Sequence, residues 1–354
     1  MPNGDEGVAA TLGVKLPPMA TKLRLGLASL VHDHVWGVLP HWQSHTEIEI
    51  VAVGEPDEAM RKEAAEKTGA KPYATWQEMI ETEQLDIVLA SSDNATSADI
   101  TEAAMAKGAH VVTEKPMAAT LAQANRMVAA AKKHDRLLMV NWPNQWEPAY
   151  VEWERRAKSG EIGRLIHVKR RNAHNGPREI GCNPAFVEWL YDEERNGAGA
   201  FMDYCCYGAA ICAYLLGLPN SVIGQRAVLA KEYPVPDDNA IVLMQYDHAF
   251  GQTEASWTEI AYGSAPSTIA YGTAGILTME GKEVVFHRPG QAPDRHLADP
   301  IEAPRRNSAE YFVHCLRTGE PIEGIGNMDV ARNAQSILDA GLRSANAGVR
   351  VTPA

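Results

Sequence analysis

From residue 22 to residue 143, the chain alternates between two patterns of apolar positions. Short, mostly apolar runs predict strands at 23–28, 48–53, 86–90, 109–112 and 137–140. Segments in which apolar residues recur every three or four positions predict helices at 35–42, 57–68, 98–107 and 121–134. Strands that alternate with helices through short connections form a parallel, doubly wound sheet. Residues 22–143 are therefore predicted to fold as a Rossmann-type domain.

The second half of the chain follows a different pattern. Most of its β-like runs succeed one another without helices between them, at 165–171, 241–246, 251–257, 276–279 and 284–287. Helical patterns occur at 149–158, 208–216, 308–317 and 328–344. Consecutive strands without crossover helices favour antiparallel pairing. We therefore predict an α/β protein in which residues 144–354 form a second, α+β domain with a largely antiparallel open sheet.

The first residues of the chain match neither domain pattern. Residues 1–21 contain glycine and proline and lack the basic start and apolar core of a signal peptide. We expect them to be a flexible N-terminal extension.

Composition narrows the class of protein and of partner. The 354 residues, 45% hydrophobic and 22% charged, suit a soluble globular chain of two domains. No run approaches the roughly 18 apolar residues of a membrane span. The net charge of −12 and the shortness of the basic clusters, 169–171 and 305–306, argue against nucleic acid. We expect neither a membrane nor a nucleic-acid partner.

The cysteines bear on the cellular compartment. The chain has five of them, an odd number, and their spacing matches neither a zinc site nor a disulfide framework. This pattern favours a reduced, cytoplasmic setting and predicts no metal site.

The segment Thr113-Glu114-Lys115-Pro116 is the first candidate for chemistry. It follows a buried strand, and ligands bind at the carboxyl ends of the strands in open α/β sheets. Pro116 keeps Lys115 extended and makes the chain turn directly after it. A surface salt bridge in a loop is the alternative interpretation of a lone Glu-Lys-Pro.

A dinucleotide site needs a glycine-rich turn after the first strand and an acid after the second. Glu55 supplies the acid, and its charge would repel a 2′-phosphate, which favours NAD over NADP. The turn, however, reads G-L-A-S-L-V-H-D-H over 26–34. Ser29 is small enough for the tight turn, whereas Val31 brings a Cβ close to the expected pyrophosphate. A Rossmann-like domain without a nucleotide is therefore the alternative.

The remaining candidate cofactor contacts lie in the loops at the same edge of the sheet. They are His32, His34, Ser91, Ser92, Asn94, Glu114 and Lys115. The two histidines could equally be helix-start residues with no chemical role.

A second motif occurs at residues 196–208, where a glycine-rich approach leads to Asp203 and, four residues later, Tyr207. Together with Glu114-Lys115-Pro116 on a Rossmann domain, it resembles the Gfo/Idh/MocA family of sugar and polyol oxidoreductases. Most members carry histidine where this chain has Tyr207, and tyrosine resembles the glucose–fructose oxidoreductase and dihydrodiol dehydrogenase branches. The resemblance runs from about Lys22 to the end of the chain.

This resemblance implies an NAD-dependent oxidoreductase that acts on a sugar or polyol hydroxyl, assembled as a homodimer or homotetramer. The chain departs from the family at three places. The glycine turn is degenerate, residues 141–146 lack the usual arginine, and residues 91–94 lack the usual proline.

Alcohol oxidation requires a base beside the carbon that loses hydride. Tyr207 is one candidate, because a nearby Lys115 would lower its pKa from about 10. Lys115 is the other, with Tyr207 positioning the substrate. Asp203 lies one helical turn before Tyr207 and can share its face. It would bind a substrate hydroxyl or hold Lys115, or else cap a helix that begins near Tyr204.

Sugar rings stack on aromatic side chains and need polar contacts at their rims. Trp142, Trp146, His174 and Asn175 are the further candidates for substrate contacts. Core packing is the alternative for each tryptophan.

Two other functions use the same residues. One is glycoside cleavage by transient oxidation with bound NAD, followed by elimination. The other is a non-catalytic protein that binds a sugar or nucleotide.

Overall fold

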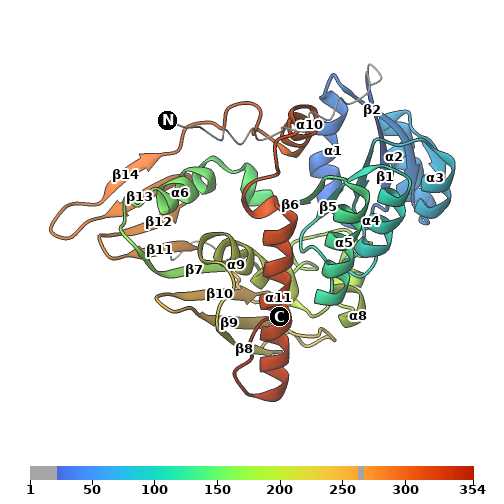
Figure 1. Cartoon of the computed structure of the whole chain (residues 1–354). Helices are drawn as coiled ribbons and strands as arrows, with labels where there is room; N and C mark the ends of the chain where they lie inside the picture. Colours follow the sequence, from blue (N-terminus) through green and yellow to red (C-terminus); the bar gives the residue numbers. More distant parts are fainter. Residues whose placement is uncertain (1–21, 262–266) are drawn as a thin grey trace, which may run out of the picture.

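A computed structural model describes residues 22–261 and 267–354 of the chain. The extension predicted for residues 1–21 lies outside the described residues. Two sheets dominate the molecule, one on each side in Figure 1, with helix α11 (Met328–Ala347) between them.

The first sheet is parallel and has six strands in the order β3-β2-β1-β4-β5-β6. The strands are β1 (Leu23–Ala28), β2 (Ile48–Gly54), β3 (Lys71–Tyr73), β4 (Ile87–Ala90), β5 (His110–Glu114) and β6 (Leu138–Asn141). The helices between them are α1 (His34–Ser44), α2 (Glu58–Thr68), α3 (Trp76–Thr82), α4 (Ser97–Ala106) and α5 (Leu121–His134). The predicted Rossmann sheet is thus confirmed. The strand order reverses between β1 and β4, which is where such sheets bind ligands.

Three of the helices that cover this sheet begin at side-chain N-caps. Thr120 and Gln123 form a capping box at the start of α5, and Asp57 and Thr75 cap α2 and α3. The central strand β4 is buried along its whole length, as a sheet covered on both faces requires.

The second sheet has eight strands in the order β14-β13-β12-β11-β7-β10-β9-β8. They are β7 (Leu165–Ala173), β8 (Ser221–Ala227), β9 (Asn239–Gln245), β10 (Phe250–Ser256), β11 (Thr268–Gly272), β12 (Ile276–Glu280), β13 (Glu283–His287) and β14 (Asp294–Leu297). Only β10 and β7 pair in parallel, and the other neighbours are antiparallel. The predicted α+β arrangement is confirmed.

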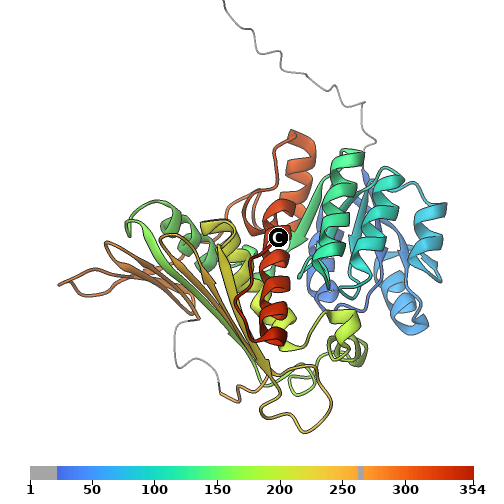
Figure 2. The same cartoon turned by 60° about the horizontal axis from the view of Figure 1, so that its bottom comes forward.

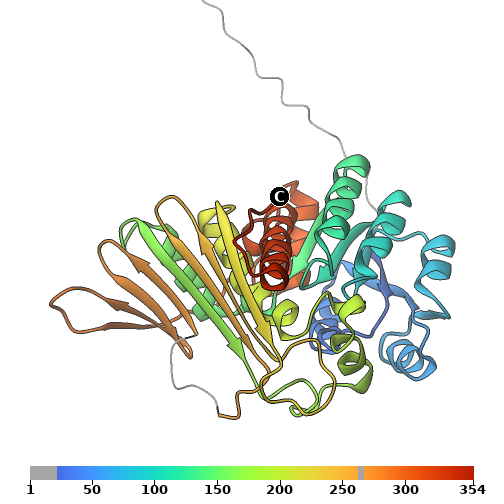
Figure 3. The same ribbon diagram turned by 90° about the horizontal axis from the view of Figure 1, so that it is seen from below.

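The remaining helices lie around and between the sheets. They are η1 (Pro143–Trp146), α6 (Pro148–Lys158), α7 (Pro184–Leu190), α8 (Glu193–Asn196), α9 (Ala200–Leu216), α10 (Ser308–Thr318), η2 (Gly324–Gly326) and α11. Figures 2 and 3 show α9 and α11 on the side of the larger sheet that faces the parallel sheet. Helix α10 returns to the first domain, where Phe312 packs against Trp42 of α1.

Helix α9 is the central helix of the second domain. The segment Glu193–Leu216 has the length and hydropathy of a membrane span, but 78% of its most apolar window is buried inside the protein. Gly208 lies within this helix because a Cβ there would collide with Thr253 of β10. The close contact of helix and sheet places residues 203–207 of α9 at the junction of the two domains.

Candidate active site

Lys115 and Asp203 form a buried ion pair between the two domains. Lys115 follows β5, Asp203 lies in the first turn of α9, and Nζ is 2.7 Å from Oδ1. The other carboxylate oxygen accepts a hydrogen bond from the indole nitrogen of Trp257 at 3.2 Å. Because α9 begins at Ala200 with Gly199 at its N-cap, the interpretation of Asp203 as a helix cap is wrong.

The pair keeps both of its members charged. Burial by itself would lower the pKa of Lys115, but the carboxylate of Asp203 holds that pKa well above its ordinary value. Burial would likewise raise the pKa of Asp203, and the ammonium of Lys115 holds it below its ordinary value. The site therefore contains a protonated lysine and an ionised aspartate at neutral pH.

Tyr207 lies beside this pair. The Lys115 ammonium is 5.1 Å from the centre of the Tyr207 ring, and the ring of Trp142 is 5.5 Å away in an edge-on arrangement. Burial raises the pKa of the Tyr207 phenol above its ordinary value, and Lys115 offsets this only in part. The expectation that Lys115 lowers the pKa of Tyr207 below that of a free phenol is therefore wrong for the protein without ligands.

The two candidate histidines are placed by different contacts. His34 Nδ1 lies 3.1 Å from Glu114 Oε2, and Asn141 donates to the other oxygen of Glu114 at 2.7 Å. His32 is buried against Phe186 and Trp189 of α7, with ring centres 4.8 Å and 5.5 Å away. Burial lowers the pKa of His32, so its imidazole is neutral.

By distance alone, His32, His34 and Glu114 could hold a metal ion, since one ligand atom from each lies within 4.8 Å of the others. Hydrogen bonds already use these atoms. His32 Nε2 contacts the carbonyl oxygen of Lys115 at 3.3 Å, and its Nδ1 accepts from the backbone of His34 at 3.4 Å. We therefore assign no metal to the cluster.

The turn after β1 keeps the backbone shape of a dinucleotide turn without its glycines. Ser29 has a φ of 61°, in the left-handed region that glycine usually fills. Glu55 is only 1% exposed, and one of its oxygens accepts from the backbone of Leu30 at 2.6 Å and from Ser29 Oγ at 3.3 Å. Its other oxygen accepts from the backbone of Asp57 at 2.8 Å. Glu55 thus holds the turn in this structure.

The end of β4 supports a ligand site at the strand-order reversal. Ser91 Oγ is buried there and has no hydrogen-bond partner among residues 22–261 and 267–354. Buried hydroxyls are normally bonded, so this one fits a contact with a bound molecule. Together with the left-handed Ser29 and the acid at the end of β2, it fits a dinucleotide.

Two other candidates beside β4 have structural contacts. Ser92 Oγ donates to the carbonyl of Asp93 at 2.8 Å, within the turn that leads into α4. Asn94 donates to the Asn196 side chain at 2.9 Å and so ties the Rossmann domain to α8.

The substrate candidates divide into two groups. Trp142 lies beside Tyr207, and His174 packs edge-on against Tyr204 with ring centres 4.9 Å apart. Trp146 instead donates to Asn141 and packs against Tyr311 of α10. The backbone carbonyl of Asn175 accepts a hydrogen bond from Lys231 Nζ. The structure thus brings Trp142 and His174 to the Lys115 site, whereas Trp146 packs toward α10.

Sequence reasoning missed Arg170, which lies 5.9 Å from the centre of the Tyr207 ring. It belongs to the basic cluster at 169–171, whose shortness entered the prediction only as an argument against nucleic acid. Alternation along the strand could have identified Arg170 as an inward-facing residue, because it shares the inner face of β7 with the buried Val168.

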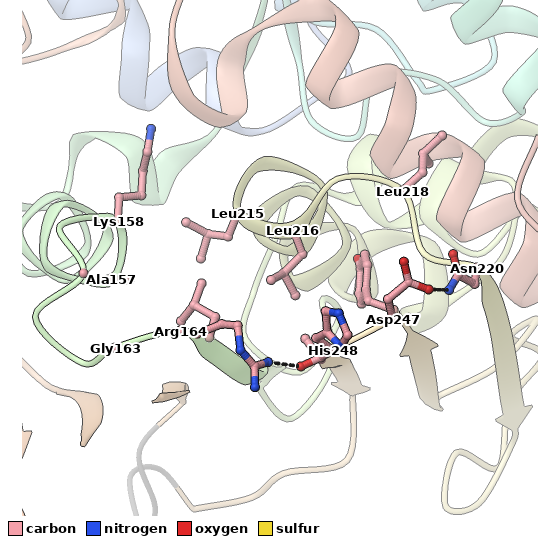
Figure 4. Close-up of a pocket in the computed structure, with 14 residues that line it drawn as sticks. Ala157, Lys158, Gly163, Arg164, Leu215, Leu216, Leu218, Asn220, Asp247 and His248 are labelled. Atoms are coloured by element: carbon pink, nitrogen blue, oxygen red, sulfur yellow. Dashed lines mark hydrogen bonds between the residues drawn. The ribbon is translucent and has the colours of Figure 1, made fainter. Parts of the chain in front are cut away.

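A surface cavity of about 630 Å³ lies elsewhere on the larger domain. Figure 4 shows its lining, with Leu215 and Leu216 from the end of α9 and Arg164 donating to the carbonyl of His248. None of its lining residues is Lys115, Asp203 or Tyr207, so it is separate from the candidate site.

Comparisons with known proteins bear on the family and the fold of the chain. Residues 34–142 match the oxidoreductase family with an NAD-binding Rossmann fold, and residues 150–278 match the GFO/IDH/MocA C-terminal domain. The chain is similar to scyllo-inositol 2-dehydrogenase (NAD(+)) of Bacillus subtilis (strain 168), with 26% identity over 345 residues, 91% of this chain and 92% of that one. It is also similar to trans-1,2-dihydrobenzene-1,2-diol dehydrogenase of Xenopus laevis, with 22% identity, covering 77% of this chain and 82% of that one.

A solved structure shares the fold. The aldose-aldose oxidoreductase of Caulobacter crescentus, complexed with glycerol, matches with a TM-score of 0.77 and 21% identity over 94% of this chain and 99% of that one. The family matches confirm the resemblance stated from the two motifs, including the oxidoreductase class and the NAD-binding domain. The chain belongs to the GFO/IDH/MocA family of oxidoreductases, with an N-terminal NAD-binding Rossmann domain.

Proposed function

We propose that the chain transfers hydride between NAD and a hydroxyl-bearing carbon of a sugar or polyol, with Lys115, Asp203 and Tyr207 around that hydroxyl. The observation that carries this proposal is the buried Lys115–Asp203 ion pair beside Tyr207, where the two domains meet. A buried lysine with a single partner at the ligand edge of a parallel sheet is typical of a functional site. The names of the relatives, which are dehydrogenases of inositol and of a diol, support the substrate class.

The cofactor, when bound, supplies the hydride acceptor or donor. The 29–34 turn, Glu55 and Ser91 are the residues that would hold it. The carboxylate of Glu55 disfavours a 2′-phosphate, which supports NAD rather than NADP. We take Ser92, Asn94 and Glu114 as residues that shape the same edge of the sheet.

Side chains of the protein bind the reacting hydroxyl and accept its proton. The ammonium of Lys115 stabilises an alkoxide by donating a hydrogen bond to the reacting oxygen. Asp203 holds the ammonium in place, with Nζ 2.7 Å from Oδ1. Because burial keeps Tyr207 protonated, its hydroxyl is a hydrogen-bond donor in the resting site. Either Tyr207 or Lys115 must lose a proton to solvent before it can accept the proton of the substrate hydroxyl.

The walls of the site suit a polyhydroxylated ring. Trp142 offers an aromatic edge beside Tyr207. His174 accepts the Gly176 backbone N–H at its Nδ1 atom at 2.7 Å, so in its neutral form the Nε2 atom carries the proton. Burial lowers the pKa of His174, which keeps it neutral and makes it a donor toward a substrate hydroxyl.

Replacing Lys115 by methionine tests the proposal. The purified protein is mixed with NAD and a panel of inositols, aldoses and alditols, and NADH is followed by its absorbance. We expect Lys115→Met to lower kcat by about 10²–10⁴-fold, the usual contribution of a positioned acid–base group. Lys132→Met is the matched control, because Lys132 is exposed and pairs with Asp329 on α11.

The same assay separates the alternatives. A loss below about threefold for Lys115→Met would remove Lys115 from the mechanism. Release of free sugar from a glycoside without net NADH would indicate elimination chemistry. Binding of sugar with no turnover of any kind would indicate a non-catalytic protein.

A further inference from the structure

Arg170 is a buried cation without an ion pair. Its side chain is 8% exposed, on the face of β7 that packs against α9. Its guanidinium donates to three neutral acceptors, which are Asn172 Oδ1 at 2.6 Å, Ser267 Oγ at 3.5 Å and the hydroxyl of Thr268. Over residues 22–261 and 267–354 no carboxylate forms an ion pair with it, whereas the neighbouring Lys169 and Arg171 both pair with Glu254. Buried arginines are normally paired, so the missing anion calls for an explanation.

The charges around Tyr207 leave one positive charge in excess. The Lys115 ammonium and the Arg170 guanidinium lie 5.1 Å and 5.9 Å from the centre of its ring. Asp203 balances Lys115. Glu147 is the acid that acts most on Arg170, but its side chain is exposed and forms no ion pair with it. A bound monoanion would neutralise the excess.

A second donor beside Tyr207 also lacks a partner. Trp142 is 1% exposed, and its indole N–H has no acceptor among the described parts of the chain. The indole can donate but not accept, and the same is true of the guanidinium. The Arg170 guanidinium has hydrogen bonds but no counter-ion, and the Trp142 indole N–H has no acceptor in the described residues. Two such donors beside one phenol ring are complementary to the oxygens of an anion.

We infer that the substrate of this site is a sugar acid, whose carboxylate binds Arg170, with the indole N–H of Trp142 as a further donor. This inference rests on the proposed function, because Lys115 and Tyr207 face the hydroxyl that reacts. A carboxylate carries the single negative charge that the site lacks, whereas a phosphate group carries nearly two at neutral pH. The planar guanidinium can also donate two parallel hydrogen bonds to the two oxygens of a carboxylate.

Equilibrium binding tests the inference directly. Isothermal titration calorimetry with NAD present compares D-gluconate and D-glucuronate with D-glucose and myo-inositol as probes. We expect the acids to bind more tightly, and Arg170→Met to weaken their binding by about 10- to 100-fold, which corresponds to about 1.4–2.8 kcal/mol. Binding of the neutral probes should change by less than about threefold, or roughly 0.7 kcal/mol.

Two more variants guard against a merely structural effect. Arg170→Lys keeps the charge and loses the planar fork, so its affinity for the acids should lie between those of the original protein and Arg170→Met. Arg171→Met is the matched control, because Arg171 lies on the opposite face of β7 and should leave acid binding unchanged. Circular dichroism checks that each variant is folded.

Three outcomes decide between the inference and the proposed function. Acids that bind no more tightly than neutral sugars would overturn the sugar-acid inference, as would equal losses for both classes in Arg170→Met. NADH formed from neutral probes alone, with Arg170→Met fully active, would overturn it while leaving the proposed function intact. Binding of acids that depends on Arg170, without NADH from any probe, would support the acid site and contradict hydride transfer.

Discussion

At the scale of single residues, the proposed mechanism depends on the protonation states of Lys115 and Tyr207. Sequence reasoning placed these two side chains together with Asp203, and the structure does so too. It also predicted a lowered phenol pKa, which is wrong. Neighbouring charges can be guessed from motifs, but the depth of burial cannot. In this site burial has the larger effect on Tyr207 and raises its pKa.

A dependence of rate on pH follows from these raised pKa values. A group with a raised pKa keeps its proton at neutral pH and loses it only as the pH rises through that value. Oxidation of a hydroxyl needs a deprotonated acceptor, so kcat/KM for oxidation should increase from about pH 6 to about pH 10, whereas kcat/KM for reduction should fall at the alkaline end. Initial rates in both directions check this. A flat or falling oxidation profile would contradict a proton-accepting role for Lys115 and Tyr207.

At the scale of elements, strongly patterned segments were predicted and short polar ones were not. The apolar runs of β1, β2 and β4 lie within one residue of their predicted bounds. Strands β8 and β11 were missed, as were the edge strands β3 and β14. β3 has three residues around a proline, and β14 reads Asp-Arg-His-Leu. Edge strands like these owe their structure to a neighbour rather than to their own pattern.

Helix α9 shows the same limit. The apolar pattern predicted only 208–216, although the second motif placed Asp203 and Tyr207 on one helical face, and the helix in fact begins at Ala200. The segment around its start contains glycines at 197, 199 and 208. The structure explains the last of these: a Cβ at Gly208 would meet Thr253 of β10. Glycine is therefore required at position 208 by a contact between distant segments, which no local pattern encodes.

Two glycine-to-alanine substitutions test that explanation. Gly208→Ala should destabilise the protein by about 1–3 kcal/mol through overpacking against β10. Gly37→Ala, in α1, should instead stabilise it by about 0.5–1 kcal/mol, because nothing lies within 4 Å of the added Cβ and alanine favours a helix. Urea denaturation measures both free energies of unfolding. Equal effects at the two positions would show that the α9–β10 contact does not require glycine.

At the scale of the whole molecule, two domains share one site. Lys115 comes from the parallel sheet, and Asp203 and Tyr207 come from the helix beneath the larger sheet. Bonds across the junction fix this arrangement, including Trp189 to the carbonyl of Val31 at 3.0 Å. The fold class was predictable because strand alternation is local. The packing of α7 on the turn after β1 was not predictable, since it joins residues 150 or more positions apart.

The outer face of the larger sheet leads to a prediction about assembly. Ile223, Leu243 and Phe250 point away from α9 and α11, with 38%, 43% and 57% of their surfaces exposed. An apolar patch on a flat sheet favours association, so we expect a homodimer or homotetramer that buries this face. Leu243→Asp would place a charge at the centre of the contact and should shift the protein toward monomer. Size-exclusion chromatography with light scattering measures the mass of each, and Lys282→Asp on the β12–β13 turn is the charge-changing control. A monomeric mass for the unsubstituted protein would contradict the predicted assembly. An unchanged mass for Leu243→Asp would show that this face is not the contact.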